Sequence, residues 1–191
     1  MDDRRTRKTR RLLREALADF LIEKSVDKIT VKELTEKVDI HRSTFYGNFE
    51  DIYDLQDHTE NIAFGEVKSL FQGGYHLKDF FIAILKYIDD NKKMSQLFFK
   101  GKIGHSFIDR LKEVFLDLYI ARLRRKEYGA DMTDEELRSY TSPYVAYLFA
   151  GSIDVINNWA KGEMSHSIED VAEILYNLAM QIEDSLLVSL K

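Results

Sequence analysis

Hydrophobic residues recur three and four positions apart along most of the chain, the spacing of helices that bury one face. The pattern predicts about nine helices, near residues 9–24, 31–38, 42–48, 51–71, 77–91, 92–101, 105–127, 134–162 and 168–189. The chain has one proline and nine glycines, and no alternating strand pattern bounded by turn residues stands out. The sequence therefore predicts an all-α fold.

The first three predicted helices have apolar faces that complement one another. The first contributes Leu13, Ala16, Leu17, Phe20 and Leu21. These residues are expected to pack on Val31, Leu34, Val38, Phe45 and Phe49. The result would be a small three-helix domain at residues 1–50, followed by a larger helical domain at residues 51–191.

The second and third helices are predicted to form a helix-turn-helix. Thr30 and Glu33 match a T-x-x-E capping box, which places the start of a helix at about Val31. Asp39 stands where the chain must turn, and a short helix follows from about Arg42 to Asn48.

In such a unit the second helix lies in the DNA major groove and reads the bases. Its exposed polar residues would be His41, Arg42, Ser43, Thr44 and Asn48. Arg42 suits guanine, Asn48 suits adenine and Tyr46 suits a phosphate, while Phe45 and Phe49 should face inward. The alternative is a helical hairpin on a core, with these polar residues merely solvated.

The N-terminus is strongly basic. Seven cations accompany two carboxylates in the first fourteen residues, namely Arg4, Arg5, Arg7, Lys8, Arg10, Arg11 and Arg14. Residues 1–46 carry a net charge of +3 and residues 47–191 one of −8, within a total of −5. An arm of this kind could neutralise phosphates and reach along the minor groove, although a charge run can also be only a solvated tail.

The run TVKELTEKVDIHRSTFYGNFEDIYDL resembles the signature of TetR-type transcriptional regulators. The resemblance covers about residues 9–60, and its frame is Thr30, Leu34, Val38, Ile40, Thr44, Phe45, Tyr46 and Phe49. By this resemblance, the positions that commonly touch DNA are Thr30, Lys32, His41, Arg42, Ser43, Thr44 and Tyr46.

The chain departs from the family pattern at three positions. Asp39 stands where glycine is usual in the turn, and His41 where a serine or threonine cap is common. Ile52 replaces a lysine that usually meets phosphate. Because Glu50 and Asp51 suit the following helix dipole but face DNA poorly, affinity is expected to lean on the N-terminal arm.

The resemblance implies that the C-terminal domain holds a small-molecule effector. Candidate pocket residues are Phe80, Phe98, Phe107, Phe115, Tyr119, Tyr144 and Tyr147. At helical spacing these aromatic residues also fit an ordinary core.

The last two helices each have an apolar stripe that suits a homodimer interface. The expected interface residues are Leu148, Gly151, Ser152, Val155, Trp159, Leu175, Leu178, Ile182 and Leu186. Two such helices per chain can form a four-helix bundle across a two-fold axis, although both stripes could instead face the chain's own core. Pro143 either kinks the penultimate helix or starts a new one.

Other function classes find little support. There is no cysteine, no signal-peptide core and no apolar run long enough to span a bilayer, so the cytoplasm is the expected location. No nucleophile, base and orienting group can be assigned, and no cofactor or metal is expected. His58 beside Asp54, Asp57 and Asn61 is better explained as a solvated helix face.

The sequence thus predicts a dimeric one-component transcriptional regulator, a repressor, that binds double-stranded DNA at a palindromic operator and responds to an unknown small molecule. The alternative is a coactivator or adaptor of the same fold that acts through a protein partner.

Overall fold

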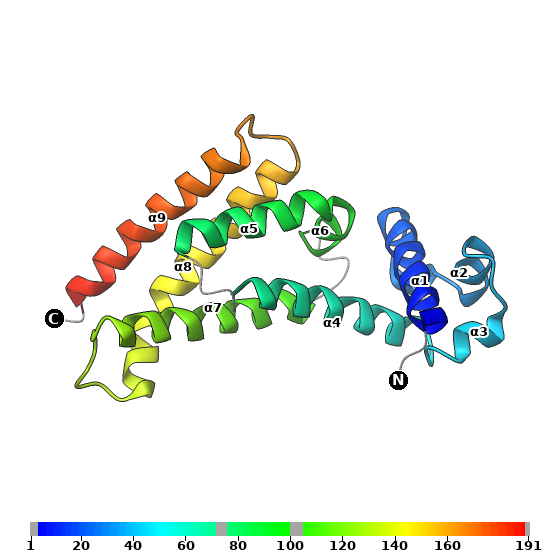
Figure 1. Ribbon diagram of the computed structural model, residues 1–191, viewed down its shortest axis with the longest axis horizontal. Coiled ribbons are helices and arrows are strands. Elements are labelled where there is room, and N and C mark those ends of the chain that lie inside the picture. Colours follow the sequence, from blue (N-terminus) through cyan, green and yellow to red (C-terminus); the bar gives the residue numbers. More distant parts are fainter. Residues whose placement is uncertain (1–3, 72–75, 100–104, 190–191) are drawn as a thin grey trace. The chain divides into compact units, whose positions relative to one another are not determined.

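The computed structural model describes residues 4–71, 76–99 and 105–189, and these residues form nine α-helices and one short 3-10 turn (Figure 1). The helices are α1 (Arg4–Glu23), α2 (Val31–Lys37), α3 (Arg42–Tyr46), α4 (Ile52–Phe71), α5 (Leu77–Asp90), α6 (Lys92–Phe99), α7 (His105–Arg125), α8 (Asp134–Ala160) and α9 (Ile168–Ser189). The 3-10 turn η1 covers Val26–Lys28. The predicted all-α fold is confirmed.

Two of the helix boundaries that differ from the predicted ones lie in α1 and α3, and the structure decides between the two alternatives for Pro143. α1 begins at Arg4 rather than near residue 9, because arginine and lysine favour helices and no breaker precedes the apolar stripe. The basic arm is therefore helical from Arg4 onward. α3 ends at Tyr46, since Gly47 takes the C-cap position. Pro143 lies inside a continuous α8 and does not start a new helix.

The helices group into two compact units. The N-terminal unit comprises Met1–Gly65 and Lys93–His105, and the C-terminal unit comprises Glu66–Lys92 and Ser106–Lys191. The first part of α4 and nearly all of α6 therefore pack with the N-terminal helices. A functional division between residues 1–50 and 51–191 stays a prediction.

The core of the N-terminal unit is built from α1, α2, α3 and the start of α4. Its buried apolar residues include Leu13, Ala16, Leu17, Leu21, Ile29, Leu34, Phe45, Phe49 and Leu55. Phe20, which is predicted for this core, is only half-buried. The ammonium groups of Lys24 and Lys37 each lie 5.0 Å from the centre of its ring. Val31 and Val38 are likewise half-buried.

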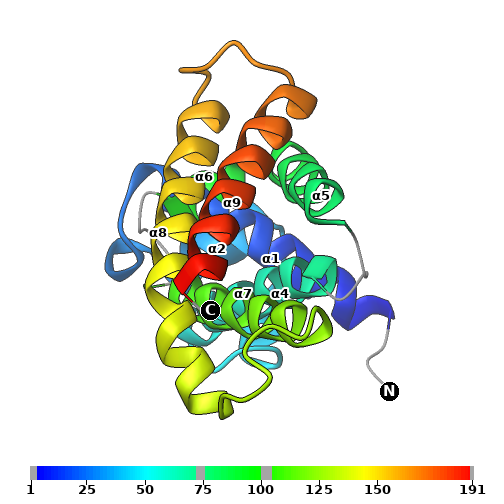
Figure 2. The same cartoon turned by 90° about the vertical axis from the view of Figure 1, so that its left-hand side faces the viewer.

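In the C-terminal unit α9 packs against both α5 and α8, and Figure 2 shows α8 and α9 side by side. Aromatic rings from several helices form a second cluster. The ring centroids of Phe71 and Phe80 are 4.5 Å apart, and Phe115 lies 6.2 Å from Phe71 and 6.0 Å from Phe149. Such separations are typical of favourable aromatic packing.

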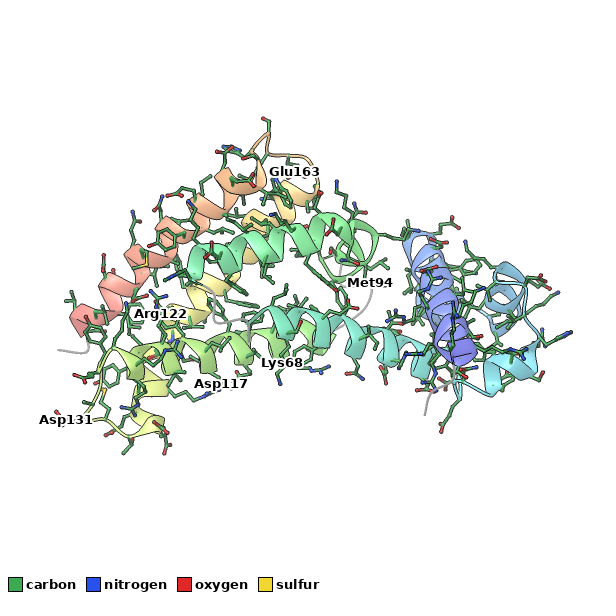
Figure 3. The ribbon with its side chains drawn as sticks, viewed as in Figure 1. Lys68, Met94, Asp117, Arg122, Asp131 and Glu163 are labelled. Atoms are coloured by element: carbon green, nitrogen blue, oxygen red, sulfur yellow. The ribbon has the colours of Figure 1, made fainter. Side chains whose placement is uncertain are left out.

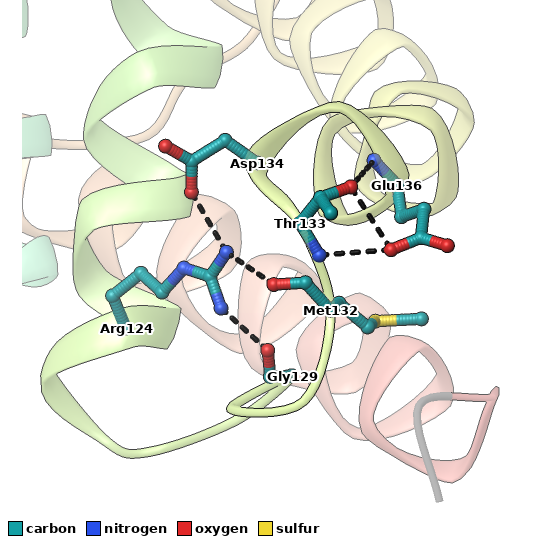
Figure 4. A network of polar contacts seen from close by, with 6 residues as sticks. All are labelled: Arg124, Gly129, Met132, Thr133, Asp134 and Glu136. Atoms are coloured by element: carbon teal, nitrogen blue, oxygen red, sulfur yellow. Dashed lines mark hydrogen bonds and ion pairs between the residues drawn. The ribbon is translucent and has the colours of Figure 1, made fainter.

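The loop between α7 and α8 is held by Arg124 (Figure 4). Its guanidinium donates to the carbonyls of Gly129 and Met132 and to the carboxylate of Asp134. Thr133 then caps α8 through a complete capping box with Glu136. The Met132 N–H also donates to the Gly129 carbonyl at 3.0 Å, so Arg124 adds side-chain bonds to a turn that is already closed by a backbone bond.

Two glycines are expected to respond to alanine in opposite directions. Gly129 has a φ of +66°, and an added Cβ would lie 2.9 Å from the Cδ1 of Leu137, which is itself fully buried. Gly129→Ala should therefore lower the free energy of unfolding by about 1–3 kcal/mol. Gly65 lies within α4 with open space around its Cβ position, so Gly65→Ala should raise it by about 0.5–1 kcal/mol. Urea denaturation at one fixed protein concentration measures both, and a neutral Gly129→Ala would contradict the steric argument.

Candidate nucleic-acid interface

The start of α2 is held by a complete capping box. The Glu33 N–H donates to the Thr30 Oγ1 at 3.2 Å, and the Thr30 N–H donates to the Glu33 Oε2 at 2.9 Å. The Lys24 Nζ also donates to the Glu33 Oε1 at 2.6 Å. These bonds lower the pKa of Glu33 to about 2, with the bond from Lys24 as the largest cause. The predicted capping box is confirmed, and the bond from Lys24, the residue that follows α1, links the start of α2 to the end of α1.

The turn between α2 and α3 requires an unusual backbone conformation. Asp39 has a φ of +53°, in the left-handed region that glycine adopts most easily. The Ile40 N–H donates to the Thr35 carbonyl at 3.0 Å and closes the turn. Aspartate tolerates this region better than most residues, so Asp39 can replace the glycine that is usual in the related motif. It also places an exposed carboxylate in the turn.

α3 has one buried and one exposed face. Phe45 is fully buried and Phe49 nearly so, as predicted. Tyr46 is 59% exposed, and Arg42 and Ser43 are exposed beside it. His41 occupies the N-cap position without a side-chain hydrogen bond to the helix. A guanidinium, a hydroxyl and a phenol are thus presented together on a short helix, the donor set that suits base edges and phosphates.

The remaining predicted DNA-contact residues lie on neighbouring elements of the same unit. The exposed ones are Thr30, Lys32, Arg4, Arg5, Arg7 and Lys8. Thr44 is half-buried on α3. Lys32 pairs loosely with Glu36 at 3.7 Å, and both side chains stay more than 60% exposed. Such an ion pair contributes at most about 0.5 kcal/mol and leaves the ammonium available.

Asn48 has a different place from the one predicted. It follows α3, is half-buried, and its Nδ2 donates to the Thr44 carbonyl at 2.8 Å. Its Oδ1 accepts from the Arg10 Nε at 3.3 Å. Both ends of the amide are therefore bonded within the protein, and neither is presented as a free group for an adenine.

The start of α4 is acidic and internally capped. The Asp54 N–H donates to the Asp51 Oδ1 at 2.9 Å, and the Glu50 N–H donates to the Asp54 Oδ2 at 2.9 Å. Ile52, at the position where a lysine is usual, is half-buried. Tyr53 beside it is 55% exposed. The first turn of α4 therefore presents carboxylates and a phenol rather than an ammonium.

Asp19 of α1 joins three helices of the N-terminal unit. Its carboxylate pairs with Lys37 of α2 at 2.9 Å and with Lys93 of α6. These two lysines, Lys93 first, hold the pKa of Asp19 below its usual value. α6 is thereby connected to the helices that carry the recognition motif.

The predicted pocket residues do not all come together. Phe80, Phe115 and Tyr119 belong to the aromatic cluster of the C-terminal unit, and Phe107 is buried on α7. Phe98 is buried on α6, in the N-terminal unit. Tyr147 is 75% exposed, and the half-buried Tyr144 has its hydroxyl 3.4 Å from the Ser189 Oγ.

A buried carboxylate adjoins the aromatic cluster. Glu183 of α9 is 1% exposed and accepts hydrogen bonds from Lys126 at 2.6 Å and from the Tyr119 hydroxyl at 3.3 Å. The Nη2 of Arg122, a residue labelled in Figure 3, lies 3.1 Å from the Glu183 Oε2, the oxygen that also accepts from Tyr119. Burial, and then the charge of Glu183, raises the pKa of Tyr119, so this phenol stays neutral. Two cations thus compensate a charge that would be costly to bury alone.

The predicted interface residues divide into two groups. Leu148, Leu175 and Leu186 are buried within the chain itself, where α8 and α9 pack on each other. Leu178 is 44% exposed, and Gly151 is exposed with open space at its Cβ position. Ser152, Val155, Trp159 and Ile182 are half-buried. Of the predicted interface residues, the ones with appreciable solvent-accessible surface are therefore Leu178, Gly151, Ser152, Val155, Trp159 and Ile182.

Three structural features have no clear signal in the sequence. Glu183 falls within an ordinary charged helix, and only its partners on α7 show that it is buried. Phe71 and Phe149 join the aromatic cluster from helices far apart in the chain. Arg10 is one cation among seven in the basic segment, and its bond to Asn48 spans 38 positions. Such long-range contacts leave no local periodicity to detect.

Three further findings concern the residues that the structure describes. Their acidic and histidine side chains form no group of three or more that could hold a metal ion. None of their helices combines the length and apolar character needed to cross a bilayer. The ring of His58 packs 5.3 Å from that of Phe49.

Comparisons with known proteins agree with this architecture. Residues 75–181 match the TetR_C_8 family model, described as a transcriptional regulator C-terminal region. A TetR transcriptional regulator from Streptococcus agalactiae is 22% identical with a TM-score of 0.63, covering 93% of this chain and 96% of that one.

Two other solved structures share the fold. The dihydroxyacetone kinase operon activator DhaS is 22% identical with a TM-score of 0.61, covering 92% of this chain and 97% of its own. The fatty acid degradation regulator FadR from Bacillus halodurans is 10% identical with a TM-score of 0.63, covering 90% and 94%. No curated protein sequence matches the chain. The matched family is one of transcriptional regulators rather than enzymes.

The α2 capping box should weaken in acid. Because the pKa of Glu33 is lowered from 4.5 to about 2, its contribution to stability is present above pH 4.5 and is lost as the pH falls through about 2. An NMR titration of the Glu33 side-chain carboxyl should have its midpoint near pH 2. Lys24→Ala should move that midpoint upward, because it removes the largest cause. A wild-type midpoint near 4.5 would show that the box is not formed in solution.

Proposed function

The chain belongs to the TetR family of transcriptional regulators, and we propose that it is a dimeric one-component regulator, a repressor, that binds a palindromic operator. The observation that carries this proposal is the face of α3. Arg42, Ser43 and Tyr46 are exposed there, while Phe45 behind them is completely buried. Buried aromatic residues hold the helix, and donors suited to base edges and phosphates are left accessible.

The charge distribution supports binding to DNA. The exposed cations Arg4, Arg5, Arg7 and Lys8 lie on α1, in the same unit as α3. Cations that neutralise phosphates release counterions, so the affinity would fall steeply with salt. Because α1 begins at Arg4, these cations would approach DNA from a helix rather than from an extended arm.

Dimerisation is the second part of the proposal. On the described surface of α8 and α9 the large exposed apolar residues are Tyr140, Tyr147, Leu178 and Val188. Gly151, which has no side chain, and the small Ser152 on α8 permit close approach of another helix. A two-fold pair of such chains would place two recognition helices about one DNA turn apart, so the operator would be palindromic.

Regulation by a small molecule is the third part. The aromatic cluster around Phe115 and the neutral hydroxyl of Tyr119 offer apolar contacts and a polar group within the C-terminal unit. An effector releases DNA only if it binds the DNA-incompetent state more tightly, and the coupling is reciprocal.

A coactivator that acts through a protein partner is the second candidate. Ile52 replaces a phosphate-binding lysine, and Glu50, Asp51 and Asp54 crowd the start of α4, where carboxylates would repel DNA. The structurally similar DhaS is described as an operon activator, so the fold also serves activation.

Arg42 should decide between these candidates. Arg42→Ala is expected to weaken binding to a DNA selected from a random pool by about 10–100-fold, because a bidentate contact to guanine is lost. Tyr46→Phe should cost less, since it removes one phosphate bond. Fluorescence anisotropy across several salt concentrations measures both.

Asp131→Ala in the α7–α8 loop serves as the control, since this exposed residue belongs to the C-terminal unit. Weak wild-type binding that is indifferent to DNA sequence and to Arg42 would favour the protein-partner candidate.

The dimer is tested at Leu178. Leu178→Arg should convert the protein to a monomer in sedimentation velocity, because a charge would be forced into an apolar interface. Asn177→Arg introduces the same group at the neighbouring exposed position of α9 and should leave association nearly unchanged. A monomeric wild type would rule the dimer out.

A further inference from the structure

Arg10 of α1 contacts two residues that follow the recognition helix α3 in the sequence, Asn48 and Phe49. Its Nε donates to the Asn48 Oδ1 at 3.3 Å, and its guanidinium carbon lies 5.9 Å from the centre of the Phe49 ring. The centre of that ring also lies 5.9 Å from the ring of Phe45 and 5.3 Å from that of His58 of α4. Arg10 therefore lies against an aromatic ring that α3 and α4 also contact.

Asn48 relays this contact into α3. The amide donates through Nδ2 to the Thr44 carbonyl at 2.8 Å while it accepts from Arg10 through Oδ1. Only one orientation of the amide satisfies both bonds, since a carbonyl cannot donate and a guanidinium cannot accept. The chain of contacts runs from α1 through Asn48 to the last turn of α3.

α3 needs such external support. It is five residues long, and its N-cap residue, His41, makes no side-chain hydrogen bond to it. A helix of this length does not persist alone, because nucleation costs more than its few hydrogen bonds return. A cation near the C-terminal end of a helix is also favoured by the helix dipole. Arg10 supplies both a hydrogen bond and a positive charge at that end.

We propose that Arg10 is a positioning residue that fixes the recognition helix through Asn48 and Phe49, rather than a phosphate contact like its neighbours in the basic segment. This inference rests on the proposed DNA-binding function. It adds that one of the seven basic residues acts on the geometry of α3. Asn48 accordingly serves as the relay and does not read a base.

The first test needs no DNA. The amides of Gly47, Asn48 and Phe49 donate to carbonyls of α3, so their hydrogen exchange reports how firmly the end of that helix is held. In full-length Arg10→Ala their exchange should accelerate about tenfold, as expected for losing a hydrogen bond to a charged group. Arg10→Lys should not restore protection, because an ammonium lacks the planar fork of a guanidinium.

Arg11→Ala is the matched control. It removes the same charge one position away, from a guanidinium bonded to Glu15 of its own helix at 2.7 Å. Exchange at Gly47, Asn48 and Phe49 should stay at the wild-type rate in this variant. Adding Asn48→Ala to Arg10→Ala should accelerate exchange little further, because both changes interrupt the same relay.

The second test uses a DNA selected from a random pool with the wild-type protein. Arg10→Ala should weaken binding about tenfold while the slope of log K against log salt stays unchanged. A lost phosphate contact would instead reduce that slope by about 0.9.

Unchanged amide exchange in Arg10→Ala would overturn the inference, and so would a reduced slope without faster exchange. If the wild type bound no selected DNA, the proposed function would fail, while the exchange experiment would still decide whether Arg10 holds α3.

Discussion

The structure depends on holding a five-residue helix in a fixed orientation. α3 is too short to be stable by itself, so its position must come from tertiary contacts. Phe45 and Phe49 supply most of the apolar burial, and fully burying a phenylalanine contributes about 1.5–3 kcal/mol. The polar contacts around Asn48 then fix the rotation of α3 about its own axis, which apolar burial alone does not determine. The exposed face of α3 is consequently determined by residues on α1 and α4.

The N-terminal unit also carries carboxylates near the face proposed to bind DNA. Glu33, Asp51 and Asp54 each accept a backbone N–H at a helix start, so these carboxylates stabilise the fold close to the face proposed to bind DNA. Asp39 meets the conformational demand of the turn without a glycine. Each of these acidic groups weakens attraction to phosphate. Under the proposed function, the cations of α1 would offset that repulsion.

Features of this fold that depend on residues close together in the sequence were predictable. Features that depend on contacts between distant residues were not. The α2 capping box and the inward orientation of Phe45 depend on residues a few positions apart, so helical periodicity reveals them. In the sequence, Asn48 resembles a residue that reads a base. Its bond to Arg10 joins positions 38 residues apart and forms only when α1 has packed, so the sequence pattern does not reveal it. The apolar stripes of α8 and α9 indicate burial but not the partner. Leu148 and Leu175 proved to be buried within the chain, whereas Leu178 is exposed.

Asp19 forms ion pairs with Lys37 of α2 and Lys93 of α6, and these pairs connect α6 to the helices of the motif. Lys37 and Lys93 are 39% and 54% exposed, so each pair contributes only about 0–1 kcal/mol. Leu97 and Phe98 of the same helix are buried and contribute more. The burial of these two side chains therefore contributes more to the stability of α6 than its ion pairs with Asp19 do. Any regulatory change that reached α1 through α6 would have to repack those two side chains, because breaking the ion pairs alone supplies too little free energy to shift a two-state equilibrium.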